Sequence, residues 1–276
     1  MTSSKIFSII TFLYGLALVL YIISWVFKKS FPGKLAVAAT IAGATGNLAG
    51  VILRWIESYQ MGIGHAPLSN LYESLIFFAM TIAIVHLFIA FKYKQRIIGV
   101  VSSPIPFLAM AYASLPKVND SIQPLIPALQ SNWLIAHVMA CFIGYSAFAI
   151  AFGISIIFLL KSPDAEQQTG IMARIPDFDT LDDLTHQMVM FGFLFLSIGI
   201  ITGAVWANQA WGRYWGWDPK ETWSLITWLI YATMLHARLM RGWQGKRIAV
   251  LSCIGFFAVI FTYFGVNLLP GLHSYQ

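Results

Sequence analysis

Hydrophobic segments of about 20 residues recur along the chain and are separated by short polar connections. A helix rises about 1.5 Å per residue, so roughly 20 apolar residues suffice to cross the hydrocarbon core of a bilayer. The pattern predicts eight transmembrane helices, at about 6–27, 35–53, 71–91, 97–115, 132–160, 187–207, 219–237 and 248–269. The sequence therefore predicts an all-α polytopic membrane protein, which we take as a single domain over residues 1–276.

The connections between these segments leave no room for a soluble domain. The longest run over about 54–70, 161–186 and 208–218. Pro104 and Pro106 are expected to kink the fourth helix, because proline cannot donate the backbone hydrogen bond that a helix needs. The stretch 121–130 is too short to span and is expected to lie on the outer surface. The acidic stretch 162–185 is expected to be a solvated inner loop.

The composition excludes a water-soluble protein. Hydrophobic residues make up 58% of the chain and charged residues only 10%, whereas soluble domains carry about 25% charged residues. The net charge of +6 would suggest a nucleic-acid partner in a soluble protein. In a membrane protein, however, basic residues mark the cytoplasmic side. We therefore expect a lipid bilayer around the chain and no nucleic acid bound to it.

The basic residues are distributed unequally between the two sets of connections. Twelve of the 17 lie in one set, namely Lys28, Lys29, Lys34, Lys92, Lys94, Arg96, Lys161, Arg174, Arg238, Arg241, Lys246 and Arg247. The other set holds Lys5, Arg54, Lys117, Arg213 and Lys220. The positive-inside rule predicts that the first set faces the cytoplasm or its equivalent. Both termini and the loop over 206–223 are then expected on the outer side.

The two cysteines, Cys141 and Cys253, lie in apolar segments and form no CxxC motif. This excludes a thioredoxin-like redox role, and it also excludes a c-type cytochrome, which needs a CxxCH attachment motif. We expect both cysteines to serve packing.

Five tryptophans fall within residues 206–223, in the sequence Trp-Ala-Asn-Gln-Ala-Trp-Gly-Arg-Tyr-Trp-Gly-Trp-Asp-Pro-Lys-Glu-Thr-Trp. An interfacial aromatic belt accounts for some of them, but not for Gly212 and Gly216 between the aromatics. Glycine lets the backbone approach a ligand, and indole faces offer stacking area with a polar edge. The pattern favours a platform for a large planar apolar ligand.

The residues that follow this aromatic run predict a helix start. Asp218 at the N-cap, Pro219 at the first helical position and Glu221 two residues further form a strong capping pattern. We interpret Asp218 as mainly structural, with a catalytic acid as the alternative.

The segment from Trp211 to Trp223 resembles the tryptophan-rich WWD motif of haem-handling membrane proteins. The eight-helix plan, together with the stretch Gly-His-Ala-Pro-Leu-Ser-Asn-Leu-Tyr-Glu-Ser-Leu that begins at Gly64, is similar to the CcsA (also ResC) subunit family of the system II cytochrome c synthase. The resemblance covers essentially the whole chain. The WWD motif is shared with haem-handling relatives of system I, and the histidine spacing is what favours the CcsA type.

The resemblance implies a role in cytochrome c biogenesis. Such a protein binds haem b, presents it on the outer face and supports its thioether attachment to the CxxCH motif of apocytochrome c. It works with a CcsB/ResB-type membrane subunit, so whether this chain alone is a complete haem lyase stays open. The expected location is the bacterial cytoplasmic membrane or a thylakoid membrane.

The resemblance also assigns haem ligands. His137, about 8 Å below the outer end of the fifth predicted helix, and His273 in the outer tail match the two outer axial ligands. His236, about 26 Å below the outer end of the seventh, matches a ligand of a haem held within the membrane. The loop residues expected to contact haem are Trp211, Tyr214, Trp215, Trp217, Asp218 and Trp223.

The second ligand of the membrane haem has three candidate answers. The resemblance assigns it to the partner subunit. His86 lies about 23 Å along the third predicted helix, at nearly the depth of His236, and an intramembrane histidine is by default a functional candidate. Alternatively, no stable inner haem forms, and His86 bonds a neighbouring helix.

The remaining histidines, His65 in an outer loop and His186 at the inner end of the sixth predicted helix, and the polar residues at the start of the third helix have plainer interpretations. His65 and His186 are expected to be structural. Ser69, Asn70 and Glu73 read as N-cap and capping-box residues of the third helix, and Glu73 is also a candidate contact for a ligand or partner.

Two alternative functions remain open. One is a b-type dihaem electron-transfer subunit, which would bury both ligand pairs within helices, whereas His273 lies in a tail. The other is a haem exporter without ligation chemistry, which would use the same residues. We find no Ser/His/Asp set or carboxylate dyad that would indicate hydrolysis.

Overall fold

The structure, a computed structural model, describes residues 2–93, 96–161 and 174–269. Six of its helices are long and apolar enough to cross a membrane. They are α1 (Ser3–Phe27), α2 (Ser30–Gln60), α3 (Leu71–Tyr93), α6 (Asn132–Leu160), α7 (Phe178–Trp211) and α9 (Lys246–Tyr263). The described ranges contain no β-strand. The predicted all-α, polytopic membrane architecture is confirmed.

The other two predicted helices differ from these six. The fourth is interrupted at Ser103 and becomes α4 (Arg96–Ser102) and α5 (Pro104–Ala113), because Pro104 and Pro106 cannot continue the backbone ladder. The seventh, α8 (Pro219–Arg241), has the length to span but is less apolar than the six. The structure also describes two short 3₁₀ helices, η1 (Pro127–Leu129) and η4 (Gly265–Leu268).

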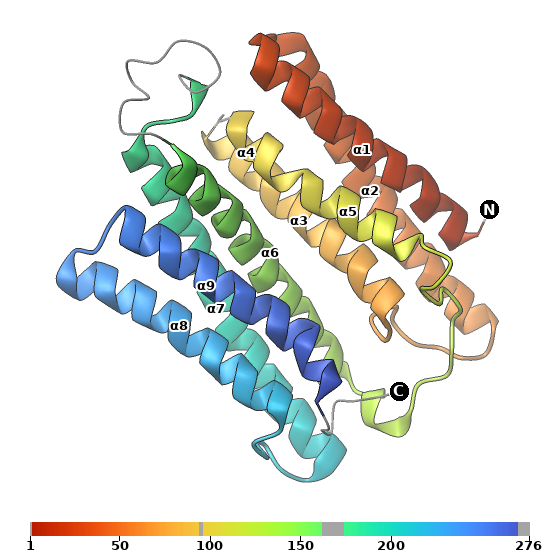
Figure 1. The fold of residues 1–276 in the computed structure, drawn as a ribbon. Coiled ribbons are helices and arrows are strands. Elements are labelled where there is room, and N and C mark those ends of the chain that lie inside the picture. Colours follow the sequence, from red (N-terminus) through yellow and green to blue (C-terminus); the bar gives the residue numbers. More distant parts are fainter. Residues whose placement is uncertain (1, 94–95, 162–173, 270–276) are drawn as a thin grey trace. The chain divides into compact units, whose positions relative to one another are not determined.

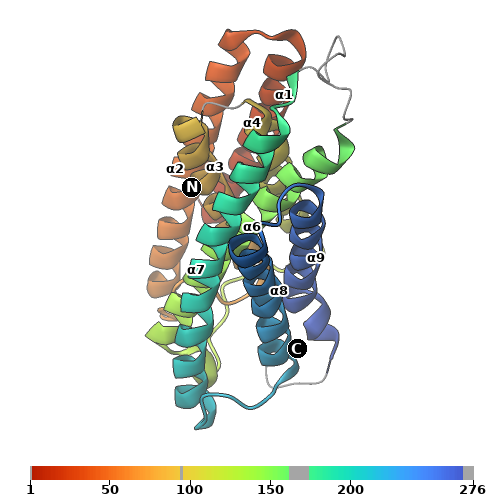
Figure 2. The same ribbon diagram turned by 90° about the vertical axis from the view of Figure 1, so that its left-hand side faces the viewer.

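The chain forms two compact units, Met1–Gln130 and Ser131–Gln276, called unit 1 and unit 2 below. Unit 1 contains α1 to α5, and its core packs α1, α3 and α5 against one another through buried apolar side chains such as Tyr14, Ile76 and Met110. Unit 2 contains α6 to α9, which lie beside one another in Figures 1 and 2. The single haem-handling domain inferred from the sequence stays a prediction.

Close backbone approach holds α6 against α7 in unit 2. A Cβ atom added at Gly144 would lie 2.9 Å from the carbonyl oxygen of Gly192. Small residues at such crossings are typical of membrane helices, where packing replaces hydrophobic driving force. One turn further along α6, the ring of Phe148 stacks on Tyr231 of α8 at 3.6 Å between centroids. These contacts fix three of the four helices that build the candidate site.

The start of α7 corrects the expectation of a solvated loop over 162–185. Residues 162–173 lie outside the described residues, but α7 already begins at Phe178. The Asp177 carboxylate accepts the Thr180 N–H at 2.6 Å, and these hydrogen bonds lower the pKa of Asp177. Asp182 is buried because it pairs with Arg238 of α8 and accepts the N–H of Gly245 at 2.8 Å. The acidic residues therefore cap and tether helices.

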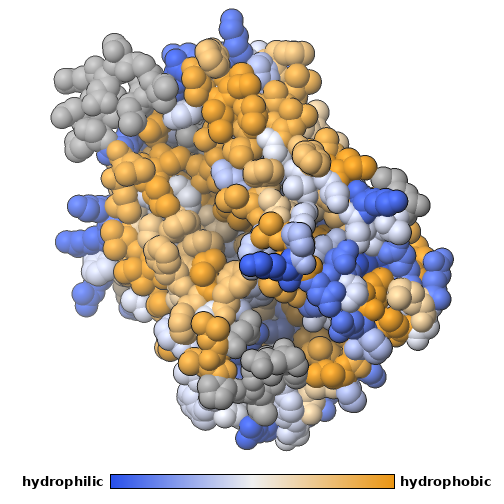
Figure 3. Space-filling view, turned by 45° about the vertical axis from the view of Figure 1, so that its right-hand side comes forward, coloured by the Kyte–Doolittle hydropathy of each residue, from blue (hydrophilic) through white to orange (hydrophobic). Residues whose placement is uncertain are grey.

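The surface agrees with a lipid environment. Large hydrophobic side chains are exposed on many helices, for example Phe12, Phe88, Ile201 and Phe257. Figure 3 shows hydrophobic residues covering extended areas of the face in view. Exposed apolar side chains on so many helices are typical of a surface that contacts lipid.

Candidate functional site

His137 is positioned by the crossing of α6 and α7. A Cβ atom added at Gly203 would lie 2.5 Å from His137 Nδ1, and one added at Gly199 would lie 2.6 Å from Cys141 Sγ. Glycine at both positions of α7 therefore leaves room for the imidazole one turn above the thiol. The Nδ1–H of His137 donates to the carbonyl oxygen of Gly199 at 2.7 Å.

This hydrogen bond sets the chemistry of the imidazole. Because Nδ1 carries the proton that Gly199 accepts, the lone pair of neutral His137 lies on Nε2. A histidine whose other ring nitrogen donates to a backbone carbonyl is the usual form of a metal ligand, since the bond fixes both tautomer and ring orientation. The arrangement fits the axial ligation that the sequence predicts for His137.

His137 opens onto a recess formed within unit 2. The recess holds about 640 Å³ of space free of protein atoms, a volume that includes open solvent. Its aromatic lining comprises Tyr145, Trp206, Tyr214, Trp215 and Tyr263, and its polar lining comprises His137, Lys220, Glu221, Ser224 and Thr262. The ring of His137 stacks on Trp206 with centroids 6.1 Å apart and planes 19° apart. The recess can accept a planar apolar ligand beside a nitrogen donor.

The structure brings only part of the tryptophan-rich segment to this recess. Trp215 and Tyr214 line it, whereas Trp211 packs edge-on against Trp206 with centroids 4.9 Å apart. Trp217 packs edge-on against Trp215 with centroids 5.7 Å apart. These two residues therefore support the residues of the lining.

Two residues of the segment lie further from the expected position. Trp223 packs against Phe261 of α9 with centroids 4.2 Å apart. Trp217 is 69% exposed and has a positive φ of 58°, a strained conformation for a bulky residue. Its indole is presented on the surface, where an incoming partner can reach it.

The glycines of the loop serve backbone geometry more than ligand approach. Gly212 ends α7 with φ 74° and donates its N–H to Asn208. A Cβ atom at Gly216 would meet the Arg213 guanidinium.

Asp218 is the N-cap of α8, as expected. Its carboxylate accepts the Lys220 N–H at 3.0 Å, and Glu221 Oε2 accepts the N–H groups of Asp218 and Gly216 at 3.1 and 2.7 Å. The capping box is complete, so both carboxylates hold the loop against the helix. Asp218 does not line the recess.

The two other predicted haem ligands are not part of the described recess. His273 lies outside the described residues. His236 is exposed on α8, on the side opposite the buried Tyr231, Met234 and Ala237. A ligand bound there would contact lipid or another chain on its second side.

His86 is buried in unit 1 and hydrogen-bonded at both ring nitrogens. Nε2 lies 2.8 Å from the Tyr21 hydroxyl, and Nδ1 lies 2.7 Å from the Ser102 hydroxyl. In either neutral tautomer one ring nitrogen donates and the other accepts, so both are satisfied. Haem ligation would break one of these bonds, and the arrangement favours a link between α1, α3 and α4.

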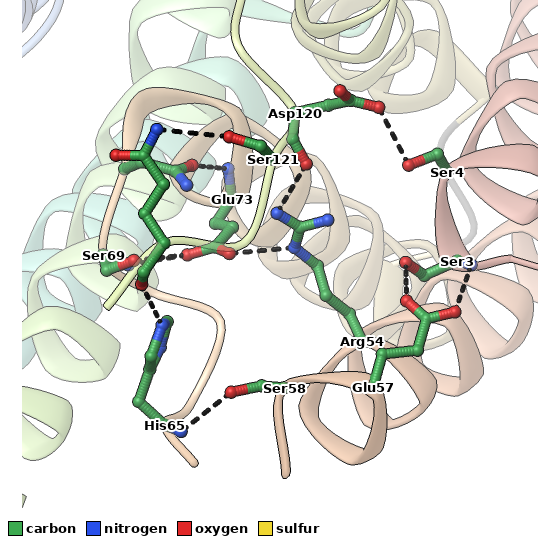
Figure 4. Close-up of polar contacts among 12 residues, drawn as sticks. Ser3, Ser4, Arg54, Glu57, Ser58, His65, Ser69, Glu73, Asp120 and Ser121 are labelled. Carbon is green, nitrogen blue, oxygen red and sulfur yellow. Dashed lines mark hydrogen bonds and ion pairs between the residues drawn. The ribbon is translucent and has the colours of Figure 1, made fainter. Parts of the chain in front are cut away.

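Glu73 lies in a buried polar cluster at one end of unit 1, shown in Figure 4. Its Oε1 pairs with Arg54 Nε at 2.8 Å, and its Oε2 accepts the N–H and the hydroxyl of Ser69 at 2.9 and 2.8 Å. Arg54 also donates to the carbonyl oxygen of Asp120 at 2.8 Å. With these partners Glu73 fastens three segments together, as its capping role predicts.

His65 belongs to the same cluster and is buried. Its backbone N–H donates to Ser58 Oγ, and its ring nitrogens lie 2.9 Å from the carbonyl oxygens of Ala66 and Gln123. This contact ties the loop before α3 to the stretch before η1, and it accords with a structural role.

Sequence reasoning missed several residues of the recess. Trp206, Tyr145 and Lys220 were not among the predicted site residues, yet all three line it. Tyr145 lies two helical turns below His137, a spacing that places it on the same face of α6. Lys220 stands in the first turn of α8, where helices favour acidic residues. Both signals were present in the sequence.

The chain matches a known family over most of its length. Residues 68–273 match the family described as "Cytochrome C assembly protein". The matched range begins just before α3, ends at residue 273 and includes every residue that lines the recess.

Individual relatives are similar over nearly the full chain. The chain is 39% identical to "Cytochrome c biogenesis protein CcsA" of Pyropia yezoensis, over 97% of this chain and 96% of the relative. It is also 39% identical to the protein of the same name from Picosynechococcus sp., over 89% of each chain.

The fold also resembles a solved structure. The solved chain is titled "Cytochrome c Heme Lyase CcmF", with a TM-score of 0.69 and 16% sequence identity. The match covers 97% of this chain but 50% of the solved one, so this chain spans about half its length. At this identity the likeness concerns the fold alone.

Proposed function

Because the chain belongs to the cytochrome c assembly protein family, we propose that it binds haem in the unit 2 recess and presents it for covalent attachment to apocytochrome c. The observation that carries the proposal is His137, whose Nδ1–H is held by Gly199 while its ring faces an aromatic recess. Iron needs a neutral imidazole nitrogen, and a porphyrin needs flat apolar walls. The recess supplies both.

Haem is the substrate in this proposal. Each cysteine thiol of the apocytochrome CxxCH motif adds across one vinyl group, so that sulfur bonds one vinyl carbon and the hydrogen goes to the other. The addition has no net oxidant or reductant. The chain contributes position: His137 holds the iron, while Trp206 and Trp215 fix the porphyrin plane.

Two further histidines complete the proposed haem path. His273 is the second axial ligand of the outer haem and lies outside the described residues. His236 binds a haem within the membrane together with a ligand from a CcsB/ResB-type partner. The exposure of His236 on α8 supports this assignment, since an exposed ligand can be shared between chains.

The proposed setting is a bacterial cytoplasmic or thylakoid membrane, with the recess on the outer side. Support comes from the twelve-to-five distribution of basic residues between the two sets of connections. Apocytochrome reaches the recess from that side. The exposed Trp217 lies beside the recess, where it can contact the apocytochrome.

The first test replaces the proposed ligands in the complex purified with its partner. In His137→Gly and His273→Gly we expect lower haem content or a shifted Soret band, because an open axial position lowers affinity, and we expect added imidazole to restore the spectrum. Wild-type occupancy and spectrum in both variants would contradict the ligand assignment.

The second test asks what the complex makes. Incubated with haem and apocytochrome, the wild-type complex should yield a product that keeps its haem in denaturing acid extraction, as thioethers do. Haem release without any linked product would identify an exporter instead.

A further inference from the structure

Among the described residues that line the unit 2 recess, Lys220 is the one lysine or arginine. It occupies the second position of α8 and lies partly buried, sharing the lining with His137, Trp206, Tyr214 and Trp215. All other lining residues are neutral or apolar except Glu221. A single ammonium therefore stands in a space otherwise walled by aromatic rings.

Among the residues that the structure describes, no carboxylate forms an ion pair with the Lys220 ammonium. Within the ranges that the structure describes, ion pairs join Arg54 to Glu73, and Arg238 to Asp182 and Asp183. The carboxylates closest in sequence are engaged elsewhere, since Glu221 Oε2 accepts two backbone N–H groups and Asp218 accepts another. Asp218 accepts the backbone N–H of Lys220, and its carboxylate acts on the ammonium only as a nearby charge.

The position is unfavourable for a lysine on local grounds. The first turn of a helix carries a partial positive charge, which disfavours a cation. Partial burial without a partner adds a desolvation cost. The capping box of Asp218 and Glu221 uses only their own side chains and backbone N–H groups, so α8 does not need the lysine. A residue that breaks local rules in this way marks a functional position.

We infer that Lys220 binds a propionate carboxylate of haem in the recess. The inference rests on the proposed function, since it assigns the polar end of the same substrate. Haem combines an iron, an apolar macrocycle and two carboxylates. The recess combines an imidazole at His137, aromatic walls at Trp206 and Trp215, and the Lys220 ammonium. Each part of the ligand thus meets the chemistry that binds it.

A lysine is suited to hold a substrate that must later leave the recess. Its ammonium is a point charge on a flexible stem, which can follow a carboxylate through small movements, whereas an arginine fork fixes it in one bidentate geometry. Lys220 is therefore a positioning residue: it sets which edge of the porphyrin faces inward and which carries the vinyl groups toward the apocytochrome.

The test compares haem with haem dimethyl ester, in which both carboxylates are neutral. Each is titrated into the purified complex with its partner, and Kd is read from the Soret band and from quenching of tryptophan fluorescence. The proteins are wild type, Lys220→Met, Lys220→Arg and, as a matched control, Lys117→Met, whose lysine is exposed in unit 1.

We expect wild type to bind the ester about tenfold or more weakly than haem, because a charge-assisted hydrogen bond is lost. Lys220→Met should weaken haem by a similar factor and leave the ester unchanged, so that the preference disappears. Lys220→Arg should keep most of the preference for haem over the ester, and Lys117→Met should keep all of that preference. Unchanged ester binding also reports that the Lys220→Met recess is intact.

The outcomes separate the inference from the proposed function. Absence of haem binding in wild type would refute the proposed function itself. Haem binding with equal wild-type affinity for the ester would overturn the inference alone. An equal loss of both ligands in Lys220→Met, with their ratio unchanged, would likewise overturn it, since the preference for free carboxylates would then not depend on the lysine.

Discussion

In unit 1, the effect of a buried charge on stability depends on its partner. The Arg54 and Glu73 side chains are 3% and 1% exposed, and each has further hydrogen bonds besides their ion pair. A buried pair contributes little net stability compared with apolar replacements, but removal of one partner leaves an unpaired buried charge. The pair thus holds the ends of α2 and α3 in register with Asp120.

We expect Glu73→Gln to lower the free energy of unfolding by about 3–5 kcal/mol, because Arg54 would stay charged and buried. The measurement is denaturant or thermal unfolding in detergent. The double variant Arg54→Met with Glu73→Gln should recover much of the loss. A Glu73→Gln protein as stable as wild type would show that water or Asp120 compensates the arginine.

The roles of the histidines depend on how far their helices bury them. α3 buries His86 between Tyr21 and Ser102, whereas α8 exposes His236 beside Leu239 and Met240. Similar depth along two helices therefore corresponds to opposite environments. The exposed position is the one open to a ligand shared with a partner.

A pair of alanine variants tests this difference at the level of the helices. In the complex with its partner, His236→Ala should remove or alter the signal of the membrane haem, and His86→Ala should leave haem content and spectrum unchanged. His86→Ala should instead lower the unfolding midpoint, since two buried hydroxyls lose their acceptor or donor. A bis-histidine signal lost in His86→Ala alone would reverse the assignment.

At the scale of the whole molecule, we expect the unequal charge of the connections to set the orientation in the membrane. The loop between α8 and α9 joins a helix end with Arg238 and Arg241 to a helix start with Lys246 and Arg247, so four basic residues flank one short turn. Moving such a turn across a bilayer is costly.

Reporter fusions check the orientation. Fusions after residues 92–96 and 238–247 should report the cytoplasmic side, and fusions at Arg213 and His273 should report the outer side, because the positive-inside rule acts on short loops. An export-dependent reporter active at position 243 would invert the scheme and move the tryptophan-rich segment to the inner side.

The sequence by itself determined the features that depend on local order. The lengths of the hydrophobic segments predicted the helices. Pro104 and Pro106 predicted the interruption at Ser103, and Asp218 with Glu221 predicted the start of α8. These follow from backbone hydrogen bonding within a few residues. The composition of the segment from Trp206 to Trp223 was likewise enough to indicate a planar ligand.

Only the tertiary structure decided which distant residues meet. Arg54 with Glu73, and Asp182 with Arg238, are pairs that neither helix reveals alone, and they turned predicted loop residues into buried ones. Of the five tryptophans, Trp206 and Trp215 line the recess, whereas Trp223 packs against Phe261 of α9. Gly199 and Gly203 let α6 approach α7 and so set the tautomer of His137. The physical reason is that side-chain periodicity fixes a face of a helix, whereas the partner of that face is fixed by packing between helices.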